Sequence, residues 1–107
     1  MMAEPQVIEH QDRFELQVDG DVAGSVSFRD WDNQRIFIHT EIGSEWGGRG
    51  LGSTLLKGAL QSTLAAGKRI VPVCDFVAGY VDRHEEYTDY TDKVTTEVTR
   101  WLRGVKR

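Results

Sequence analysis

Residues 45–56 read EWGGRGLGSTLL, and this stretch decides how the rest of the chain is interpreted. Four glycines fall within residues 47–52, directly before a run that carries leucines. Glycine weakens regular structure unless the backbone needs a left-handed conformation or a close approach that a side chain would block. Because N–H groups at the start of a helix are unpaired and partly positive, the stretch predicts a loop that binds a phosphate. The alternative is a packing turn whose glycines only let neighbouring elements approach.

Two common phosphate loops do not fit this spacing. The dinucleotide fingerprint requires G-x-G-x-x-G and an acid about 20 residues later. Here the loop reads G-x-G-x-G, and residues 66–70 contain no acid. The nucleoside-triphosphate loop ends in Gly-Lys-Ser/Thr, whereas Ser53 follows Gly52 directly. A serine hydrolase is excluded as well, since the chain has no G-x-S-x-G elbow.

Upstream of the glycines, the pattern predicts antiparallel strands. Residues 7–10 are half apolar, and residues 13–18 alternate polar and apolar side chains. Asp19-Gly20-Asp21 is typical of a hairpin turn, and residues 29–34 are interpreted as a second, polar turn. The alternating run between the turns places four residues on one face: Val22, Gly24, Val26 and Phe28.

The strand predicted over residues 35–42 has two distinct faces. Strict alternation puts Ile36, Ile38, Thr40 and Ile42 on one face. The opposite face then carries Phe37, His39 and Glu41.

Downstream of the glycines, spacings near 3.6 predict a helix that ends at Gly67. Residues 70–74 predict a buried strand, and Pro72 should leave it unpaired on one side because proline has no N–H. We expect Asp75 to cap a second helix that carries Phe76, Val77, Tyr80 and Val81. A last helix is predicted over residues 92–105, with a stripe of Val94, Val98, Trp101 and Leu102. The order of elements predicts a mixed α/β (α+β) layer fold with one crossover helix.

Composition limits the class of protein. A chain of 107 residues suits one domain, and the net charge of −4 with scattered basic residues argues against nucleic-acid binding. The single cysteine, Cys74, excludes an internal disulfide, and no apolar run approaches a membrane span. Cys74, His10, His39 and His84 are too widely spaced for a structural zinc site. We therefore expect a cytoplasmic protein without a metal and without a membrane or nucleic-acid partner.

The glycine loop resembles motif A of the GNAT superfamily of acyl-CoA-dependent N-acyltransferases. That motif usually runs Q/R-x-x-G-x-G/A and binds the coenzyme A pyrophosphate. Gly50 and Gly52 match its two small positions, while Gly47 stands where Gln or Arg is usual. With FIHTEI (residues 37–42) and VPVCDFVAGYVDRHEEY (residues 71–87), the chain resembles the very short YjdJ-type GNAT subfamily over residues 7–92. Glu85 stands where that subfamily commonly has proline.

The resemblance implies a minimal GNAT fold in one domain, with residues 7–92 as its core and residues 92–105 as a C-terminal helix. It implies a mostly antiparallel sheet whose central strands splay apart, with the pantetheine arm bound to backbone in the opening. The expected co-substrate is acetyl-CoA, and the acceptor is a small amine or a protein lysine. The implied cofactor-binding residues are Ile42, Gly43, Gly47, Gly48, Arg49, Gly50, Leu51, Gly52 and Ser53.

Four side chains are candidates for the chemistry. His39 and Glu41 share a strand face, and either could accept a proton from the amine; the alternative is a packed histidine and a solvent-facing acid. Cys74 could protonate the departing thiolate, take the acetyl group as a nucleophile, or act only as a small buried apolar residue. Tyr80 lies where many GNAT enzymes carry a tyrosine acid, but it could equally belong to the core.

Two other functions stay open at this point. The short chain has little material to enclose an acceptor, so it could bind acyl-CoA without turnover. Alternatively, Trp31, Trp46 and Trp101 could mediate protein interaction, because tryptophan is enriched at interfaces.

Overall fold

The computed structural model describes residues 4–46 and 50–105. Its elements, in chain order, are β1 (Gln6–Glu9), β2 (Arg13–Val18), β3 (Asp21–Trp31), β4 (Gln34–Ile42), the 3-10 helix η1 (Ser44–Trp46), α1 (Leu51–Ala65), β5 (Arg69–Pro72), α2 (Asp75–Arg83), the 3-10 helix η2 (Glu85–Tyr90) and α3 (Thr96–Val105). None of the helices in these described ranges is long and apolar enough to span a membrane.

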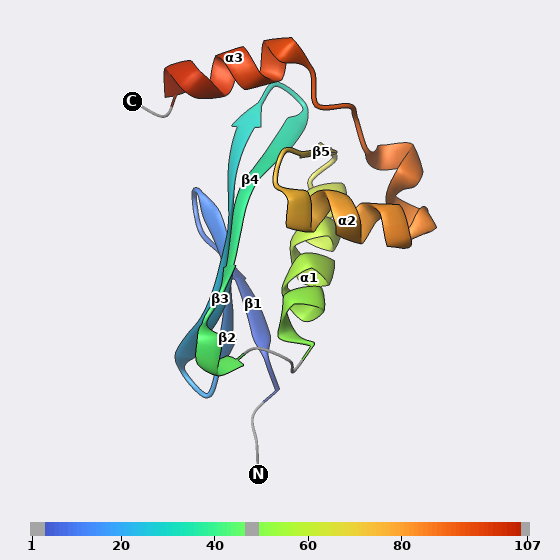
Figure 1. The fold of residues 1–107 in the computed structure, drawn as a ribbon. Coiled ribbons are helices and arrows are strands. Elements are labelled where there is room, and N and C mark those ends of the chain that lie inside the picture. The colour runs from blue at the N-terminus through green and yellow to red at the C-terminus, as the bar shows by residue number, and fades with distance from the viewer. Residues whose placement is uncertain (1–3, 47–49, 106–107) are drawn as a thin grey trace.

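The strands form one sheet in the order β1-β2-β3-β4-β5 (Figure 1). The first four strands are antiparallel, and β5 joins β4 in parallel after the chain has crossed through α1. At the β2–β3 turn, Asp19 and Gly20 have φ angles of 53° and 85°. Positive φ at both central residues of a two-residue hairpin is what Asp-Gly favours. The predicted α/β fold with a mixed, mostly antiparallel sheet is therefore confirmed.

Helix α1 covers one face of the sheet, and its apolar stripe supplies a large part of the main core. Gly67, with φ of 73°, follows the helix as predicted. Gly58 faces Val7 of β1 so closely that a Cβ at this position would lie 2.7 Å from Val7 Cγ2. The main core contains Phe14, Leu16, Val18, Ala23, Val26, Phe28, Phe37, Leu51, Leu55, Leu56, Ala59, Leu60, Ile70, Val77, Tyr80, Val81 and Tyr87.

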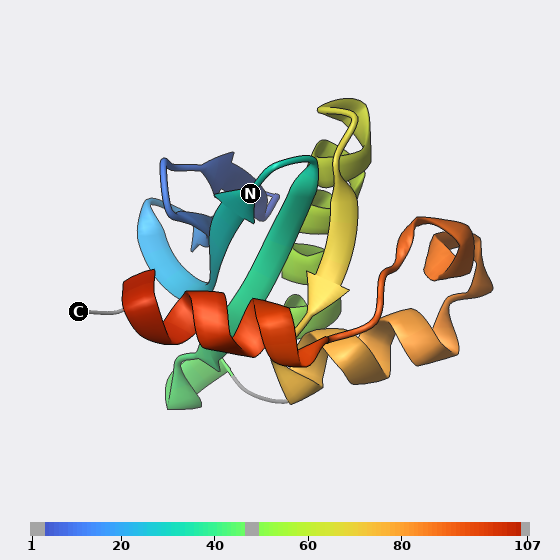
Figure 2. The same cartoon turned by 90° about the horizontal axis from the view of Figure 1, so that it is seen from above.

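Helix α3 packs across the other side of the sheet, at the end where β4 begins (Figure 2). It forms a second, smaller core with Ile36 and Val71 of the sheet, through Val98 and Leu102. The helix begins at Thr96, so the expected start at residue 92 is wrong. Val94 precedes the helix and is exposed, and Thr95 accepts the Val98 N–H through Oγ1 at the helix start. The part of the sheet face beyond α3 carries polar and charged side chains, described below.

A β-bulge in β3 changes the face predicted for Val22. Leu16 pairs with Gly24 and Gln17 pairs with Val22, so Ala23 is the extra residue. Ala23 enters the core and Val22 is 52% exposed, contrary to strict alternation. The expected turn over residues 29–34 is also wrong, because β3 continues to Trp31 and the turn is confined to two residues.

A second bulge, at Ile38 in β4, exchanges the faces of that strand. Ser27 pairs with His39 and Phe28 pairs with Phe37, which leaves Ile38 as the extra residue. As a result, Phe37 joins the main core on the α1 side, whereas Ile36 and Ile38 join the α3 core. The prediction that Phe37 shares a face with His39 and Glu41 is therefore wrong, and so is the single face proposed for Ile36, Ile38, Thr40 and Ile42.

Strands β4 and β5 part at Phe37. Pro72, the last residue of β5, pairs with Phe37, and Cys74 then donates its N–H to the Phe37 carbonyl at 2.9 Å. The chain turns into α2 at this point, while β4 continues for five residues to Ile42. In the described part of the chain, this last half of β4 has no strand on its β5 side. The parting leaves an open strand edge beside the start of α2.

Candidate functional site

The start of α1 has the geometry of an anion site. Gly50 is the N-cap and takes the left-handed conformation, with φ of 70° and ψ of 12°. The first helical hydrogen bond runs from the Thr54 N–H to the Gly50 carbonyl, so the N–H groups of Leu51, Gly52 and Ser53 have no helical acceptor. Among the described residues, no side chain caps the N–H groups of this helix start, and no acid lies in the first turn. The Gly50 carbonyl accepts a side-chain hydrogen bond, which Thr54 Oγ1 donates at 3.4 Å.

A pocket of about 310 Å³ opens at this helix start. Two aromatic rings approach glycine backbones there. A Cβ on Gly52 would lie 2.8 Å from Phe76 Cζ, and a Cβ on Gly43 would lie 2.9 Å from Trp46 Cδ1. A side chain at either glycine would therefore require the aromatic ring beside it to shift. The pocket is lined by Ile42, Trp46, Gly50, Leu51, Gly52, Ser53 and Phe76.

Five of the nine expected cofactor-binding residues thus line one pocket. Gly43 is adjacent, but its N–H is donated to Ala23 and its carbonyl accepts the Trp46 N–H, both at 2.9 Å. The other three, Gly47, Gly48 and Arg49, lie outside the described residues.

The open edge of β4 leads from this pocket to Cys74. Backbone groups of an antiparallel strand point alternately to either side, and Gly43 points its N–H toward β3. Ile42 and Thr40 therefore turn their N–H and C=O groups away from β3, toward the edge that β5 leaves open. These groups can hold an extended ligand by main-chain hydrogen bonds.

His39 and Glu41 form a pair on the sheet face opposite α1. The distance between His39 Nε2 and Glu41 Oε1 is 3.1 Å, and the two side chains are 64% and 72% exposed. The shared face predicted for these two residues is confirmed. A histidine that contacts a carboxylate in an open position can exchange protons with solvent and with an arriving amine.

Cys74 lies on the α1 side of the sheet, away from His39. It packs against the main core and is the N-cap of α2, so Asp75 is the first helical residue and not the expected cap. Its Sγ lies 3.3 Å from Thr40 Oγ1, where β4 and β5 part. The structure therefore brings Cys74 together with Thr40, while the His39–Glu41 pair lies on the other face of β4.

Tyr80 belongs to the core, where its ring stacks on His84 at 3.9 Å between centroids. Burial, and then the negative charge of Glu86, raise the pKa of Tyr80. The phenol therefore stays protonated at neutral pH and can only donate a proton. Six residues along α2 from Cys74 amount to roughly 9 Å of helix rise, so the two groups are not adjacent along the helix axis.

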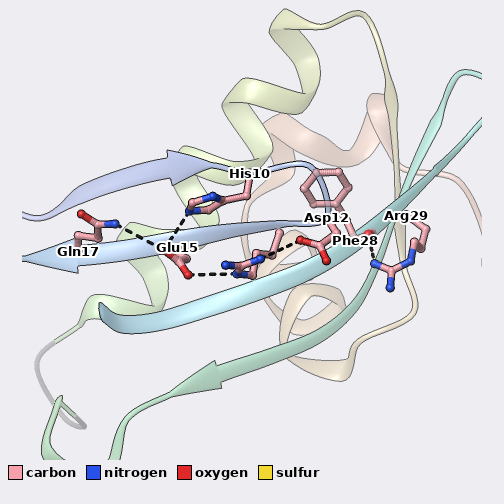
Figure 3. A network of polar contacts seen from close by, with 7 residues as sticks. His10, Asp12, Glu15, Gln17, Phe28 and Arg29 are labelled. Atoms are coloured by element: carbon pink, nitrogen blue, oxygen red, sulfur yellow. Dashed lines mark hydrogen bonds and ion pairs between the residues drawn. The ribbon is translucent and has the colours of Figure 1, made fainter. Parts of the chain in front are cut away.

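A polar network spreads from β2 across the same face as His39 and Glu41. Register places Arg13, Ser27 and His39 in one cross-strand row, and Glu15, Ser25 and Glu41 in the next. Figure 3 shows His10 and Gln17 pointing at Glu15. Burial raises the pKa of Glu15, but hydrogen bonds from Arg13, His10 and Gln17 outweigh burial and lower it overall.

All three tryptophans are used within the fold, and Trp46 packs against the main core. Trp31 and Trp101 stack face to face at 4.9 Å between centroids and 3° between planes, joining β3 to α3.

Among the described residues, no group of three or more His, Cys, Asp or Glu side chains is arranged to hold a metal ion.

Sequence reasoning missed Thr40 and Phe76 as residues of the site. The bulge at Ile38 turns Thr40 toward Cys74, and alternation alone did not indicate it. The sequence pattern placed Phe76 in the same apolar helix stripe as Val77 and Tyr80. In the structure Val77 and Tyr80 are buried, whereas Phe76 is exposed.

Comparisons with known proteins agree with this geometry. The sequence model of a family described as GCN5-related N-acetyl-transferase matches residues 13–90. No curated protein matches the chain. Among solved structures, the chain is similar to the NMR solution structure of a GCN5-like candidate N-acetyltransferase from Staphylococcus aureus, with a TM-score of 0.65 and 20% identity. The likeness covers 85% of this chain and 91% of that one, and it shows a common fold.

Proposed function

The chain belongs to the family of GCN5-related N-acetyl-transferases, and from that premise we propose that it transfers acetyl from acetyl-CoA to a primary amine by direct attack in a ternary complex. The family generally uses acetyl-CoA as its co-substrate. The acceptor proposed is a small amine or a protein lysine. We also propose, from the motifs quoted above, that the chain belongs to the very short YjdJ-type group of this family.

The observation that carries the proposal is the uncapped start of α1 beside the open edge of β4. Three N–H groups without helical acceptors, a left-handed glycine and a pocket fit a pyrophosphate. Charge-assisted hydrogen bonds contribute about 1.5–3 kcal/mol each, so three approach the ~8 kcal/mol of micromolar binding. The backbone of Ile42 and Thr40 would hold the pantetheine arm, and Gly43, Gly47, Gly48 and Arg49 stay proposed as further contacts.

The proposed chemistry uses both faces of β4. Acetyl-CoA supplies an acyl thioester, whose carbon is attacked by the amine. His39 or Glu41 takes the proton that the amine loses, on the face that α3 leaves open. Cys74 or Tyr80 gives a proton to the departing sulfur from the α1 side. The alternative for Cys74 is to take the acetyl group first and pass it to the amine.

Two measurements test the proposal. Calorimetry with acetyl-CoA should give a dissociation constant in the micromolar range, and failure to bind at millimolar concentration would contradict the function. With an accepted amine, two-substrate kinetics should give intersecting double-reciprocal lines. Parallel lines, together with an acetyl adduct on Cys74 in mass spectrometry, would replace the direct mechanism by a covalent one.

A module that binds acyl-CoA without turnover is the second candidate. Its support is the exposure of the His39–Glu41 pair, which no wall of the described chain encloses. Binding of coenzyme A without acetylation of any amine would establish this alternative.

A further inference from the structure

Phe76 is an exposed aromatic residue that the core does not explain. On the same helix, Val77, Tyr80 and Val81 are buried, whereas Phe76 is 47% exposed. Exposing a phenyl ring forfeits burial of apolar area, which contributes about 25 cal/mol per Å². The ring is nevertheless seated against the backbone of α1, with Cζ 2.8 Å and Cε1 3.3 Å from where a Gly52 Cβ would lie.

The position of the ring relative to the anion site is specific. Gly52 is the second residue of α1, so the ring borders the first-turn N–H groups directly. Phe76 also lines the same pocket as Ile42, the last residue of the open β4 edge, and it follows Cys74 by two residues in the chain. Ile42 continues the apolar lining of the same pocket.

We propose that Phe76 contacts the pantoyl unit of acyl-CoA and that Gly52 is glycine so that the ring can take this place. The inference rests on the proposed function. In coenzyme A, a single CH₂ separates the pyrophosphate from a carbon that carries two methyl groups. A pyrophosphate bound by the first turn of α1 and an arm directed toward Cys74 bring those methyls beside Phe76.

The test is calorimetry with ligands that share the phosphates and differ in the arm. Coenzyme A contains the pantoyl unit, whereas adenosine 3′-phosphate 5′-diphosphate keeps both phosphate groups and lacks the arm. Phe76→Ala should weaken coenzyme A binding about tenfold, the loss expected for one aromatic contact, and Phe76→Leu less. Neither variant should change the affinity for the nucleotide. Tyr90→Ala is the matched control, because Tyr90 is 48% exposed and does not line this pocket.

The calorimetry distinguishes a failure of the Phe76 inference from a failure of the proposed function. Unchanged coenzyme A binding by both Phe76 variants would overturn the inference while leaving the proposed function intact. Equal weakening for coenzyme A and the nucleotide would also overturn it, because Phe76 would then act only by supporting the helix start. If the unaltered protein binds neither ligand, the proposed function itself fails. Phe76→Leu keeps an apolar side chain against Gly52, so it provides the comparison should the alanine variant fail to fold.

Discussion

The side-chain oxygen of Thr40 lies 3.3 Å from the sulfur of Cys74, across the point where β4 and β5 part. A hydroxyl can rotate to donate to a thiolate, and a hydrogen bond to a charged group is stronger than a neutral one. Thr40→Val keeps the shape and removes the donor, so we expect Cys74 to be alkylated several-fold more slowly by iodoacetamide at pH 7.5. Thr40→Ser, the control, should react at the original rate. Equal rates for all three proteins would show that the contact does not influence the thiol.

Gly50 is needed for its backbone conformation and not for space. Its φ is 70°, and a Cβ there would meet no atom within 4 Å among the described residues that are not its chain neighbours. Gly50→Ala should therefore lower the free energy of unfolding by roughly 1–2 kcal/mol and weaken coenzyme A binding, because the N–H groups of the first turn would reorient. Gly20→Ala is the matched control, because Gly20 also has a positive φ, of 85°, and lies in a hairpin that is distant in sequence from the pocket. It should cost similar stability in urea unfolding without changing affinity, and equal loss of affinity would contradict the assignment.

Gly58 lets β1 pack on α1. A Cβ there would lie 2.7 Å from Val7 Cγ2 and 2.9 Å from Val7 Cβ, and a valine cannot swing away. Gly58→Ala should lower the free energy of unfolding by about 1–2 kcal/mol, although alanine is the better helix former. Adding Val7→Ala removes the obstructing methyls, so the double variant should be more stable than the sum of the single effects implies. Strict additivity in this double-mutant cycle would refute the contact.

Asp92 makes stability depend on pH. It accepts hydrogen bonds from Arg69 Nε at 2.7 Å and Gln34 Nε2 at 2.8 Å. Burial raises the pKa of Asp92, but these bonds outweigh it and lower the pKa overall. A lowered pKa in the folded state contributes stability above the unfolded pKa, and the contribution disappears as pH falls through the folded pKa.

Asp92→Asn should therefore be less stable than the parent protein at pH 7, by about 1–2 kcal/mol. The difference should shrink as urea unfolding is repeated from pH 5 down to pH 3. Asp82→Asn changes an exposed carboxylate on α2 and serves as control. A difference that stays constant across this range would show that the Asp92 carboxylate is not responsible.

His39 and Cys74 separate the possible mechanisms. If the amine attacks directly and His39 is the general base, His39→Ala should lower kcat/KM by about 100-fold, the usual effect of losing such a group. Comparison with Glu41→Ala then shows which of the two residues takes the proton from the amine. Cys74→Ser should then leave turnover measurable. If neither His39→Ala nor Cys74→Ser changes acetylation of any amine while coenzyme A still binds, the catalytic assignment of both residues is wrong.

The parts of the fold that local pattern determines could be predicted from the sequence. Strict alternation defined β2, the leucine spacing defined α1, and Asp19-Gly20 defined the hairpin, because each depends on neighbouring residues. The pocket residues from Gly50 to Ser53 were found for a related reason, since loop glycines signal a helix start that approaches a ligand.

The rest depends on pairing between strands. The bulges at Ala23 and Ile38 depend on the register in which β3 pairs with β2 and β4. No residue type within β3 or β4 indicates these bulges in the sequence. They moved Val22 and Phe37 to faces opposite those predicted, and they hid the contact between Thr40 and Cys74. The start of α3 was misplaced for another reason: Val94 fits the helical period, yet it precedes the Thr95 hydroxyl that caps the helix.

The extra residue at Ile38 shifts the in-and-out alternation of β4 side chains by one residue, which is half of its two-residue period. Before it, β4 presents Phe37 to the hydrophobic interior; after it, Thr40 and Ile42 occupy that side while His39 and Glu41 meet water. The strand therefore alternates in two registers: an odd-numbered residue faces the core before Ile38, and even-numbered residues face it afterwards. Removing Ile38 would leave Phe37 and His39 paired with the consecutive residues Phe28 and Ser27, so His39 and Glu41 would stay on the outer face of a strand without a bulge. Pairing without the bulge but with Ile38 retained would instead turn His39 and Glu41 toward the hydrophobic interior.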